Sequence, residues 1–182
     1  MMRNFILGMI VTLLLLIAGA WLVVREGYLD FSADRAPSAL ENSLAMSAVD
    51  ASTDRHAPRG NNPVAPTEEN IVAGAKLYVD HCAGCHGVPS NPDSQFGRSF
   101  NPPVPAFFHD APDMSESQNF YIIEHGIRWS GMPAWSHTLT DQQVWEAVTF
   151  LANLDKLPPA AQAALGPSPP AGPMPKGMHM SH

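Results

Sequence analysis

The chain has 182 residues, of which 45% are hydrophobic, and its formal net charge at pH 7 is −7. This length allows one domain or two small ones. Residues 67–157 hold eleven acidic and four basic side chains, which excludes the basic surface that nucleic-acid binding requires. The natural electrostatic partner of such a unit is a basic protein surface.

The first predicted element is an apolar helix over residues 5–24, which contains no charged side chain. Twenty helical residues span about 30 Å, the thickness of a bilayer core. Trp21 lies where interfacial aromatic residues occur in membrane helices. The small residues Ala18 to Ala20 also fit a cleavage site, so a cleaved signal peptide is the alternative to an anchor. Arg3 favours a cytoplasmic N-terminus, residues 1–4, with the rest of the chain exported.

Residues 25–66 are predicted to form a flexible linker, because Ala, Ser, Asp, Asn and Pro dominate most of this segment. One short helix is expected within it. Ser38 and Glu41 form a capping-box pair, and Leu40 and Leu44 follow at helical spacing. Two interpretations of this helix remain open: a transient helix in a tether, or a helix that docks on another part of the chain.

Residues 67–157 are predicted to form an all-α folded unit. Its three helical patterns begin at the cap residues Thr67, Ser115 and Thr140, and the second pattern ends at Gly126. A long proline-rich loop, residues 87–113, separates the first two patterns. A loop of this length is uncommon in a small domain. Either the helix predictions are wrong or the loop wraps something other than protein.

Residues 158–182 are rich in Pro and Ala and are predicted to be a disordered tail. Thioether and imidazole side chains, which suit copper, gather in the last nine residues. They are Met174, Met178, His179, Met180 and His182. This tail is either disordered with methionine and histidine present by chance, or a copper-binding segment of a protein that handles metal.

Both cysteines lie in the segment DHCAGCHG, where Cys82 and Cys85 are three positions apart and His86 follows directly. A thioredoxin-like redox pair would need a βαβ pattern, which is absent. A zinc site would need a second pair of ligands, and a disulfide would close too small a loop to constrain the unfolded chain. The pattern C-x-x-C-H favours covalent haem attachment, in which each thiol bonds one vinyl group and the histidine lies under the iron.

Met132 offers a second iron ligand, because it lies in a Gly-Met-Pro turn between the second and third helices and a thioether suits haem iron. The alternative role for Met132 is that of a core methionine that fills a gap. Met114 is a further conceivable ligand that lacks this setting. Four other histidines are expected at the surface or in loops: His81, His109, His125 and His137.

The residues from about Ile71 to Leu154 resemble class I c-type cytochromes, including the modules fused to oxidases and dehydrogenases. Three stretches carry the resemblance: AGAKLYVDHCAGCHG, IIEHGIRWSGMPAW and LTDQQVWEAVTFLANL. It implies a small all-α fold around one covalent haem c. It also implies that Gly74 and Tyr78 on the first helix cross the last helix near Phe150.

The resemblance assigns a role to each residue of the predicted haem site. Cys82 and Cys85 would form the two thioether bonds. His86 would be the proximal ligand of the iron and Met132 the distal ligand.

Further residues are expected around the haem. The nitrogen of His86 that faces away from the iron should donate to a backbone carbonyl, with Pro103 or Pro105 as the candidates. Arg128 and Trp129 are expected near the haem propionates, and ordinary surface placement is the alternative for both.

The chemistry expected from this site is one-electron transfer, because protein side chains fill both axial positions of the iron. The protein is then not an enzyme by itself and has no small-molecule substrate. We expect a single-pass carrier in the bacterial inner membrane, with its haem domain in the periplasm, that links redox proteins of a respiratory chain. The alternative is a fixed cytochrome subunit of a dehydrogenase or oxidase complex.

Overall fold

The structure is a computed structural model that describes residues 2–166. The chain divides into two units, one that ends at Ser32 and one that begins at Ala33. Every regular element of the described residues is helical, and these residues contain no β-strand. The predicted all-α class is therefore confirmed.

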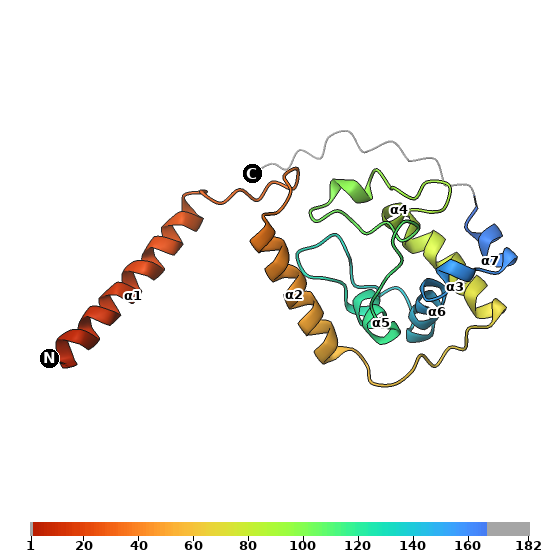
Figure 1. Cartoon of the computed structure of the whole chain (residues 1–182), viewed down its shortest axis with the longest axis horizontal. Helices are drawn as coiled ribbons and strands as arrows, with labels where there is room; N and C mark the ends of the chain where they lie inside the picture. Colours follow the sequence, from red (N-terminus) through yellow and green to blue (C-terminus); the bar gives the residue numbers. More distant parts are fainter. Residues whose placement is uncertain (1, 167–182) are drawn as a thin grey trace. The chain divides into compact units, whose positions relative to one another are not determined.

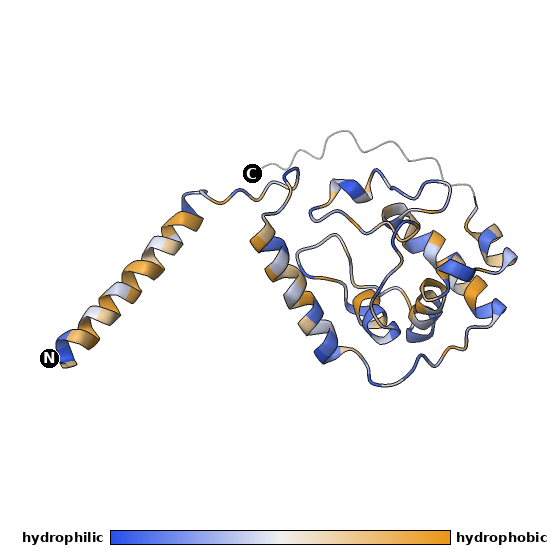
Figure 2. Ribbon diagram, viewed as in Figure 1, coloured by the Kyte–Doolittle hydropathy of each residue, from blue (hydrophilic) through white to orange (hydrophobic). Residues whose placement is uncertain are grey.

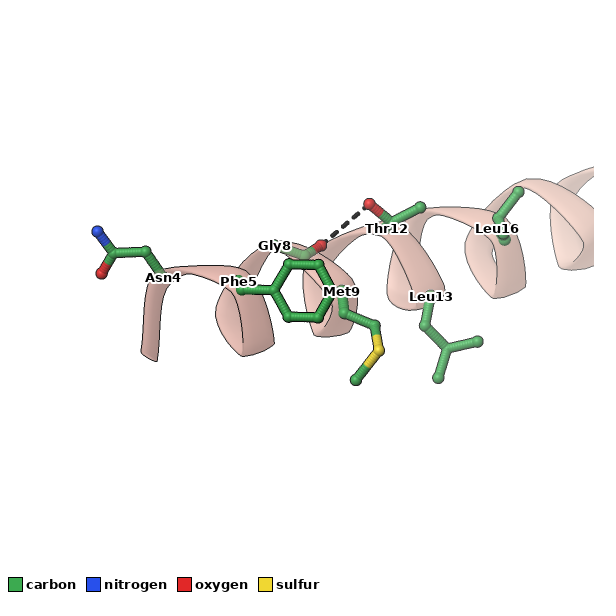
Figure 3. Close-up of a pocket in the computed structure, with 7 residues that line it drawn as sticks. All are labelled: Asn4, Phe5, Gly8, Met9, Thr12, Leu13 and Leu16. Atoms are coloured by element: carbon green, nitrogen blue, oxygen red, sulfur yellow. Dashed lines mark hydrogen bonds between the residues drawn. The ribbon is translucent and has the colours of Figure 1, made fainter. Parts of the chain in front are cut away.

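The first unit contains α1 (Met2–Arg25), which is long and apolar enough to cross a membrane. No residue of this helix is buried against other parts of the chain. Figure 3 shows one side of it, a shallow pocket lined by residues of α1 alone. There the Thr12 hydroxyl donates to the Gly8 carbonyl at 3.0 Å. A polar side chain satisfied within its own helix is compatible with lipid surroundings.

The core of the second unit is the crossing of α3 (Glu68–His81) with α6 (Asp141–Leu151), as Figure 1 shows. The helices meet at Gly74, where an added Cβ would lie 2.7 Å from Cβ of Phe150 and would clash with the backbone of α6. The rings of Tyr78 and Phe150 lie 5.1 Å apart, and both side chains are fully buried. This is the helix crossing that the sequence predicted.

The predicted helix ends are also present. Thr67, Ser115 and Thr140 each accept a hydrogen bond from the backbone N–H three residues later. Gly126, at a φ of 68°, ends α5 (Glu116–His125). These caps show that local side-chain chemistry set the boundaries of the three predicted helices.

A long loop connects α4 (Ala83–His86) to α5 and contains the short 3-10 helix η1 (Gly97–Ser99). The loop folds back on the helix before it, because α4 and η1 are in contact. Helix α5 packs on α6, where Phe120 stacks on Trp145 with their ring centroids 4.2 Å apart. These contacts position the loop after α4 and the loop after α5.

The region before the core departs from its prediction. Residues 25–66 were expected to be a flexible linker with one short helix, whereas α2 (Ala39–His56) runs for 18 residues. It begins at the predicted capping box of Ser38 and Glu41. Its C-terminal part packs on α5, and Thr53 there is only 2% exposed. Of the two interpretations of this helix, the docked one agrees with the structure.

Polar and aromatic contacts hold α2 and the segment after it against the second unit. The Gln118 side chain donates to Asp54 at 2.7 Å, and His56 stacks on Tyr121 at 5.9 Å. Asn62, after the helix, donates to a hydroxyl of α6 at 2.9 Å. Hydrophobic periodicity does not detect polar and aromatic contacts of this kind. The sequence therefore predicted a helix here but left its docking open.

The C-terminal region departs from its prediction as well. Disorder was expected from residue 158 onward, but η2 (Leu154–Lys156) is followed by α7 (Pro159–Ala164), which packs on α3. Ala161 and Leu165 are buried, at 0% and 3% exposure. The helix forms because Pro159 occupies the first helical position, where its missing N–H has no cost. Residues 167–182 lie outside the described part of the chain.

Candidate functional site

The site begins where α3 passes into α4 at Cys82. The Cys82 N–H donates to the Tyr78 carbonyl at 2.8 Å and so ends α3. The N–H groups of Cys85 and His86 donate back to the Cys82 carbonyl at 3.0 and 2.9 Å. This single turn places the two thiols three residues apart on neighbouring positions of one helical surface. No disulfide joins the two cysteines.

A core side chain binds the backbone at the end of this turn. The hydroxyl of buried Tyr78 donates to the Gly87 carbonyl at 2.8 Å, directly after His86. Burial raises the pKa of Tyr78, with a smaller contribution from Cys82, so the phenol stays protonated and acts as a donor. Gly87 has a φ of 82°, which favours glycine. The core helix therefore fixes the backbone of the C-x-x-C-H segment.

Both thiols are neutral at pH 7. Burial raises the pKa of Cys82 to about 12, with a smaller effect from neighbouring Cys85, and burial also raises the pKa of Cys85. Reactive redox cysteines need a lowered pKa. Among residues 2–166, no group of three or more His, Cys, Asp or Glu side chains is arranged to hold a metal ion. The redox-pair and zinc interpretations are therefore disfavoured.

His86 has one ring nitrogen engaged and one available. It is 9% exposed, and its Nδ1 lies 2.9 Å from the Pro105 carbonyl oxygen. Burial lowers the pKa of His86, although the bond to Pro105 partly opposes this. The ring is therefore neutral. Because a carbonyl only accepts, Nδ1 carries the proton and Nε2 keeps its lone pair, as an iron ligand requires.

The orientation of His86 depends on a residue that the sequence did not single out. The ring of Phe107 stacks on the imidazole at 4.1 Å with an interplanar angle of 9°. Phe107 follows Pro105 by two residues, so one short segment supplies both the hydrogen bond and the stacked ring. The sequence NPPVPAFF contains an aromatic pair, but its spacing alone does not say which ring faces the histidine.

Met132 lies in a turn with a fixed backbone. The Met132 carbonyl accepts from Ile127 N–H at 3.1 Å, and its N–H donates to Ser130 Oγ at 3.1 Å. Ser130 Oγ in turn donates to the Ile127 carbonyl at 2.8 Å. An added Cβ at Gly131 would clash with the ring of Phe100, so only glycine fits between this turn and the long loop. Met132 itself is half-buried against the core.

The structure places the remaining predicted residues as follows. Pro105 supplies the carbonyl to His86, whereas Pro103 is exposed and supplies none. Arg128 is exposed, and Trp129 is 94% exposed at a φ of 60°. Their placement near the haem propionates stays a prediction. Met114 is half-buried. The candidate copper residues, Met174 to His182, lie outside the described residues.

The histidines expected at the surface have weak local partners. His81 packs on Trp135 at 5.0 Å, and His109 lies 3.3 Å from Asp93. His125 lies 3.4 Å from Glu124. The fourth, His137, is exposed. None of these contacts prepares a ring nitrogen in the way that Pro105 prepares His86.

The donor set of this site fits a covalently attached haem. Two neutral thiols, one turn apart, suit addition across two vinyl groups. A buried neutral imidazole with a free Nε2 suits one axial position, and a thioether in a rigid turn suits the other. The loop that carries Pro105 and Phe107 and the turn that carries Met132 meet at the contact between Phe100 and Gly131.

Comparison with known families decides between the interpretations. Residues 69–151 match the family described as cytochrome c oxidase, cbb3-type, subunit III. These residues form a class I c-type cytochrome module. Such a module carries covalently bound haem c and transfers electrons. No curated protein matches the chain.

Proposed function

We propose that this protein is a membrane-anchored monohaem cytochrome that carries single electrons between redox partners at the periplasmic face of a bacterial inner membrane. Cys82 and Cys85 hold the haem through thioether bonds, and His86 and Met132 are its axial ligands. The observation that supports this best is the His86 ring, whose Nδ1 is bound to the Pro105 carbonyl so that Nε2 is left for iron. In this proposal the haem domain spans residues 67–157.

The protein side chains determine what the site does. Haem c, when bound, supplies a one-electron couple between ferric and ferrous iron. The hydrogen bond from His86 to Pro105 and the stacked Phe107 hold the imidazole in one orientation. The turn around Met132 would hold the thioether, and with His86 and Met132 both bound to the iron no ligand position would remain for a substrate. The expected activity is therefore electron transfer without catalysis on a small molecule.

The placement in the cell follows from α1 and from charge. We propose that α1 is retained as a single-pass anchor with its N-terminus in the cytoplasm, and that the haem domain is exported. Because residues 67–157 hold eleven acidic and four basic side chains, the partner presents a basic docking surface to the domain.

A fixed subunit of an oxidase complex is the second candidate. The matched family is described as an oxidase subunit. In addition, α2 lies against the module, so only the 13 residues between Arg25 and Ala39 connect it to α1. This connection is shorter than the predicted linker of residues 25–66, and a short connection suits a subunit that stays near its complex.

An optical spectrum tests the haem assignment. The full chain, expressed as an exported protein, should give the reduced-minus-oxidised spectrum of a c-type haem. The haem should stay attached to the chain after denaturation. Replacing both Cys82 and Cys85 with Ala should abolish the covalent haem. Met132→His should change the spectrum and the reduction potential, because the axial ligand sets both. An unchanged potential would show that Met132 is not an iron ligand. The assignment of Cys82 and Cys85 as haem attachment residues would still stand.

Copurification separates the two functional candidates. Membranes solubilised in mild detergent should release the free carrier without a fixed companion. A catalytic oxidase that stays with the chain in constant proportion through two chromatographic steps would instead assign it as a subunit.

A further inference from the structure

The helix α2 has two different faces. At 100° per residue, the face that packs on the second unit contains small and polar side chains together with one valine. They are Val49, Ser52, Thr53 and His56. The opposite face presents a stripe of two leucines followed by two small residues. This stripe, here called the outer stripe, consists of Leu40, Leu44, Ser47 and Ala51, and all four are exposed.

The orientation of α2 is the reverse of the usual one. A helix on a globular domain normally turns its largest apolar side chains toward that domain. Here Leu40 and Leu44 are 69% and 63% exposed, while Thr53 is buried. Figure 2 shows hydrophobic residues in the first part of α2 and hydrophilic ones at its C-terminal end. An exposed apolar stripe on a well-capped helix marks an interaction surface.

The spacing of the outer stripe indicates what covers it. Steps of four, three and four residues, from Leu40 to Leu44, Ser47 and Ala51, form the seam by which two helices pack side by side. We propose that two copies of this chain associate through α2, with the two outer stripes antiparallel across a two-fold axis. In that arrangement Leu44 of each copy lies against Ala51 of the other, and Ser47 lies beside its own counterpart. The large Leu44 thus meets the small Ala51, while Leu40 of each copy lies near Arg55 of the other.

Charge favours the antiparallel pair over a lipid surface. The first turn of α2 contains Glu41, and its last turn contains Arg55, about 40° from Glu41 around the helix axis. An antiparallel pair brings Glu41 of each helix beside Arg55 of the other, and it also opposes the two helix dipoles. Helices that lie on a bilayer are rich in Lys and Arg. The flanks of α2 instead contain the acidic residues Glu41, Asp50 and Asp54 with Arg55 as the only Lys or Arg.

The size of the contact indicates a weak dimer that anchoring strengthens. The 18 residues of α2 extend about 27 Å at 1.5 Å per residue. A single helix pair of this length belongs to the small, transient class of interfaces. Two copies held in one membrane have a high effective concentration, which makes such an interface sufficient.

Disulfide trapping with two matched variants tests this proposal. Ser47→Cys and Ser43→Cys each replace an exposed serine of α2 with cysteine. The unsubstituted chain, whose cysteines are Cys82 and Cys85, is the control for cross-linking through native cysteines. A disulfide needs Cα atoms within about 7 Å. In the proposed register the two copies of residue 47 are neighbours, whereas the two copies of residue 43 are separated by nine residues, about 13 Å along the axis. After mild oxidation of membranes that contain the haem-loaded full chain, S47C should run as a dimer on a non-reducing gel and S43C as a monomer.

A third variant ties the cross-link to the outer stripe. Adding Leu44→Ser to S47C should lower the dimer fraction about tenfold at subsaturating protein, because Leu44 supplies much of the apolar area buried in the pair. The haem spectrum should not change, since Leu44 is exposed and far along the chain from the haem site. Equal cross-linking of S47C and S43C, absence of an S47C dimer, or no effect of Leu44→Ser would each overturn the proposal and indicate lipid or another protein as the occupant.

Discussion

Two helix contacts within the second unit differ in kind. Where α3 crosses α6, two helices approach so closely that Gly74 admits no side chain, and the rings of Tyr78 and Phe150 are fully buried. Where α2 meets α5, the contact depends on the Gln118–Asp54 hydrogen bond and the stacked rings of His56 and Tyr121. The first contact removes apolar surface from water. The second exchanges hydrogen bonds with water for hydrogen bonds within the protein, which contributes much less.

The difference predicts two levels of stability within one unit. The α3–α6 crossing should open only when the whole module unfolds. The α2–α5 contact should open locally while the module stays folded, because few apolar side chains are buried there. The next four experiments test this division, from the largest expected effect to the smallest.

The largest effect is expected at Phe150, which is 0% exposed. Phe150→Ala should lower the free energy of unfolding by about 4 kcal/mol, because it removes a buried ring and leaves a cavity at the crossing. Chemical denaturation of the haem-loaded chain measures the change. Phe96→Ala is the matched control, since Phe96 is 52% exposed and its loss should cost less than about 1 kcal/mol. Similar losses for both variants would contradict the dominance of the crossing.

Gly74→Ala should destabilise the module by about 2 kcal/mol, because the new Cβ forces α3 and α6 apart. The added carbon would lie 2.7 Å from Cβ of Phe150. Lys76→Ala on the exposed side of the same helix is the control and should change stability by less than about 0.5 kcal/mol. If Gly74→Ala were neutral or stabilising, the helices would not be in close contact at this point.

Tyr78→Phe should remove about 1 kcal/mol at neutral pH, the contribution of the hydrogen bond to Gly87. Its pH dependence has a definite sign. The pKa of Tyr78 is raised above its ordinary value of 10.0 in the folded state, so the folded protein retains the proton when the unfolded chain loses it. Stability is therefore full below pH 10 and falls as the pH rises above it.

Phenylalanine cannot ionise, so the Tyr78→Phe variant should lack that alkaline loss. Unfolding measured at pH 8 and again near pH 11 should bring the two proteins closer together at the higher pH. A constant difference between them would mean that the phenol is not buried as a donor.

The smallest effect is expected at the α2–α5 contact. Asp54→Ala removes the partner of Gln118 and should change global stability by about 0.5 kcal/mol or less. Hydrogen exchange should nevertheless speed up in α2 and stay unchanged in α3 and α6. Ser43→Ala, on the exposed side of α2, is the control and should change neither. Faster exchange throughout the unit would show that α2 and the core open together.

The same contrast explains how much of the structure the sequence predicted. The α3–α6 crossing follows from apolar periodicity with a glycine at the contact, and the helix ends follow from caps at Thr67, Ser115 and Thr140. The two segments of the candidate haem site, which contain Cys82 to His86 and Met132, were predicted from short motifs. These signals are local, so one sequence is sufficient to detect them.

The parts that the sequence did not predict depend on contacts between distant residues. The docking of α2 was left open because its partners lie more than sixty positions away, as in Asp54 with Gln118. Helix α7 was missed because composition alone suggested disorder, although Ala161 and Leu165 fit a surface of α3. The stacking of Phe107 on His86 depends on the path of the long loop, which has no periodic pattern.

The connection between α1 and α2 limits where an electron can be delivered. Its 13 residues, even when fully extended, reach about 45 Å. For an anchored chain, encounters are then confined to a thin layer along the membrane, and the search for a partner is largely two-dimensional. A soluble acceptor must enter this layer, whereas a membrane-bound acceptor is always inside it. Lengthening the connection would therefore extend the reach of the haem domain and lower its effective concentration near membrane-bound partners.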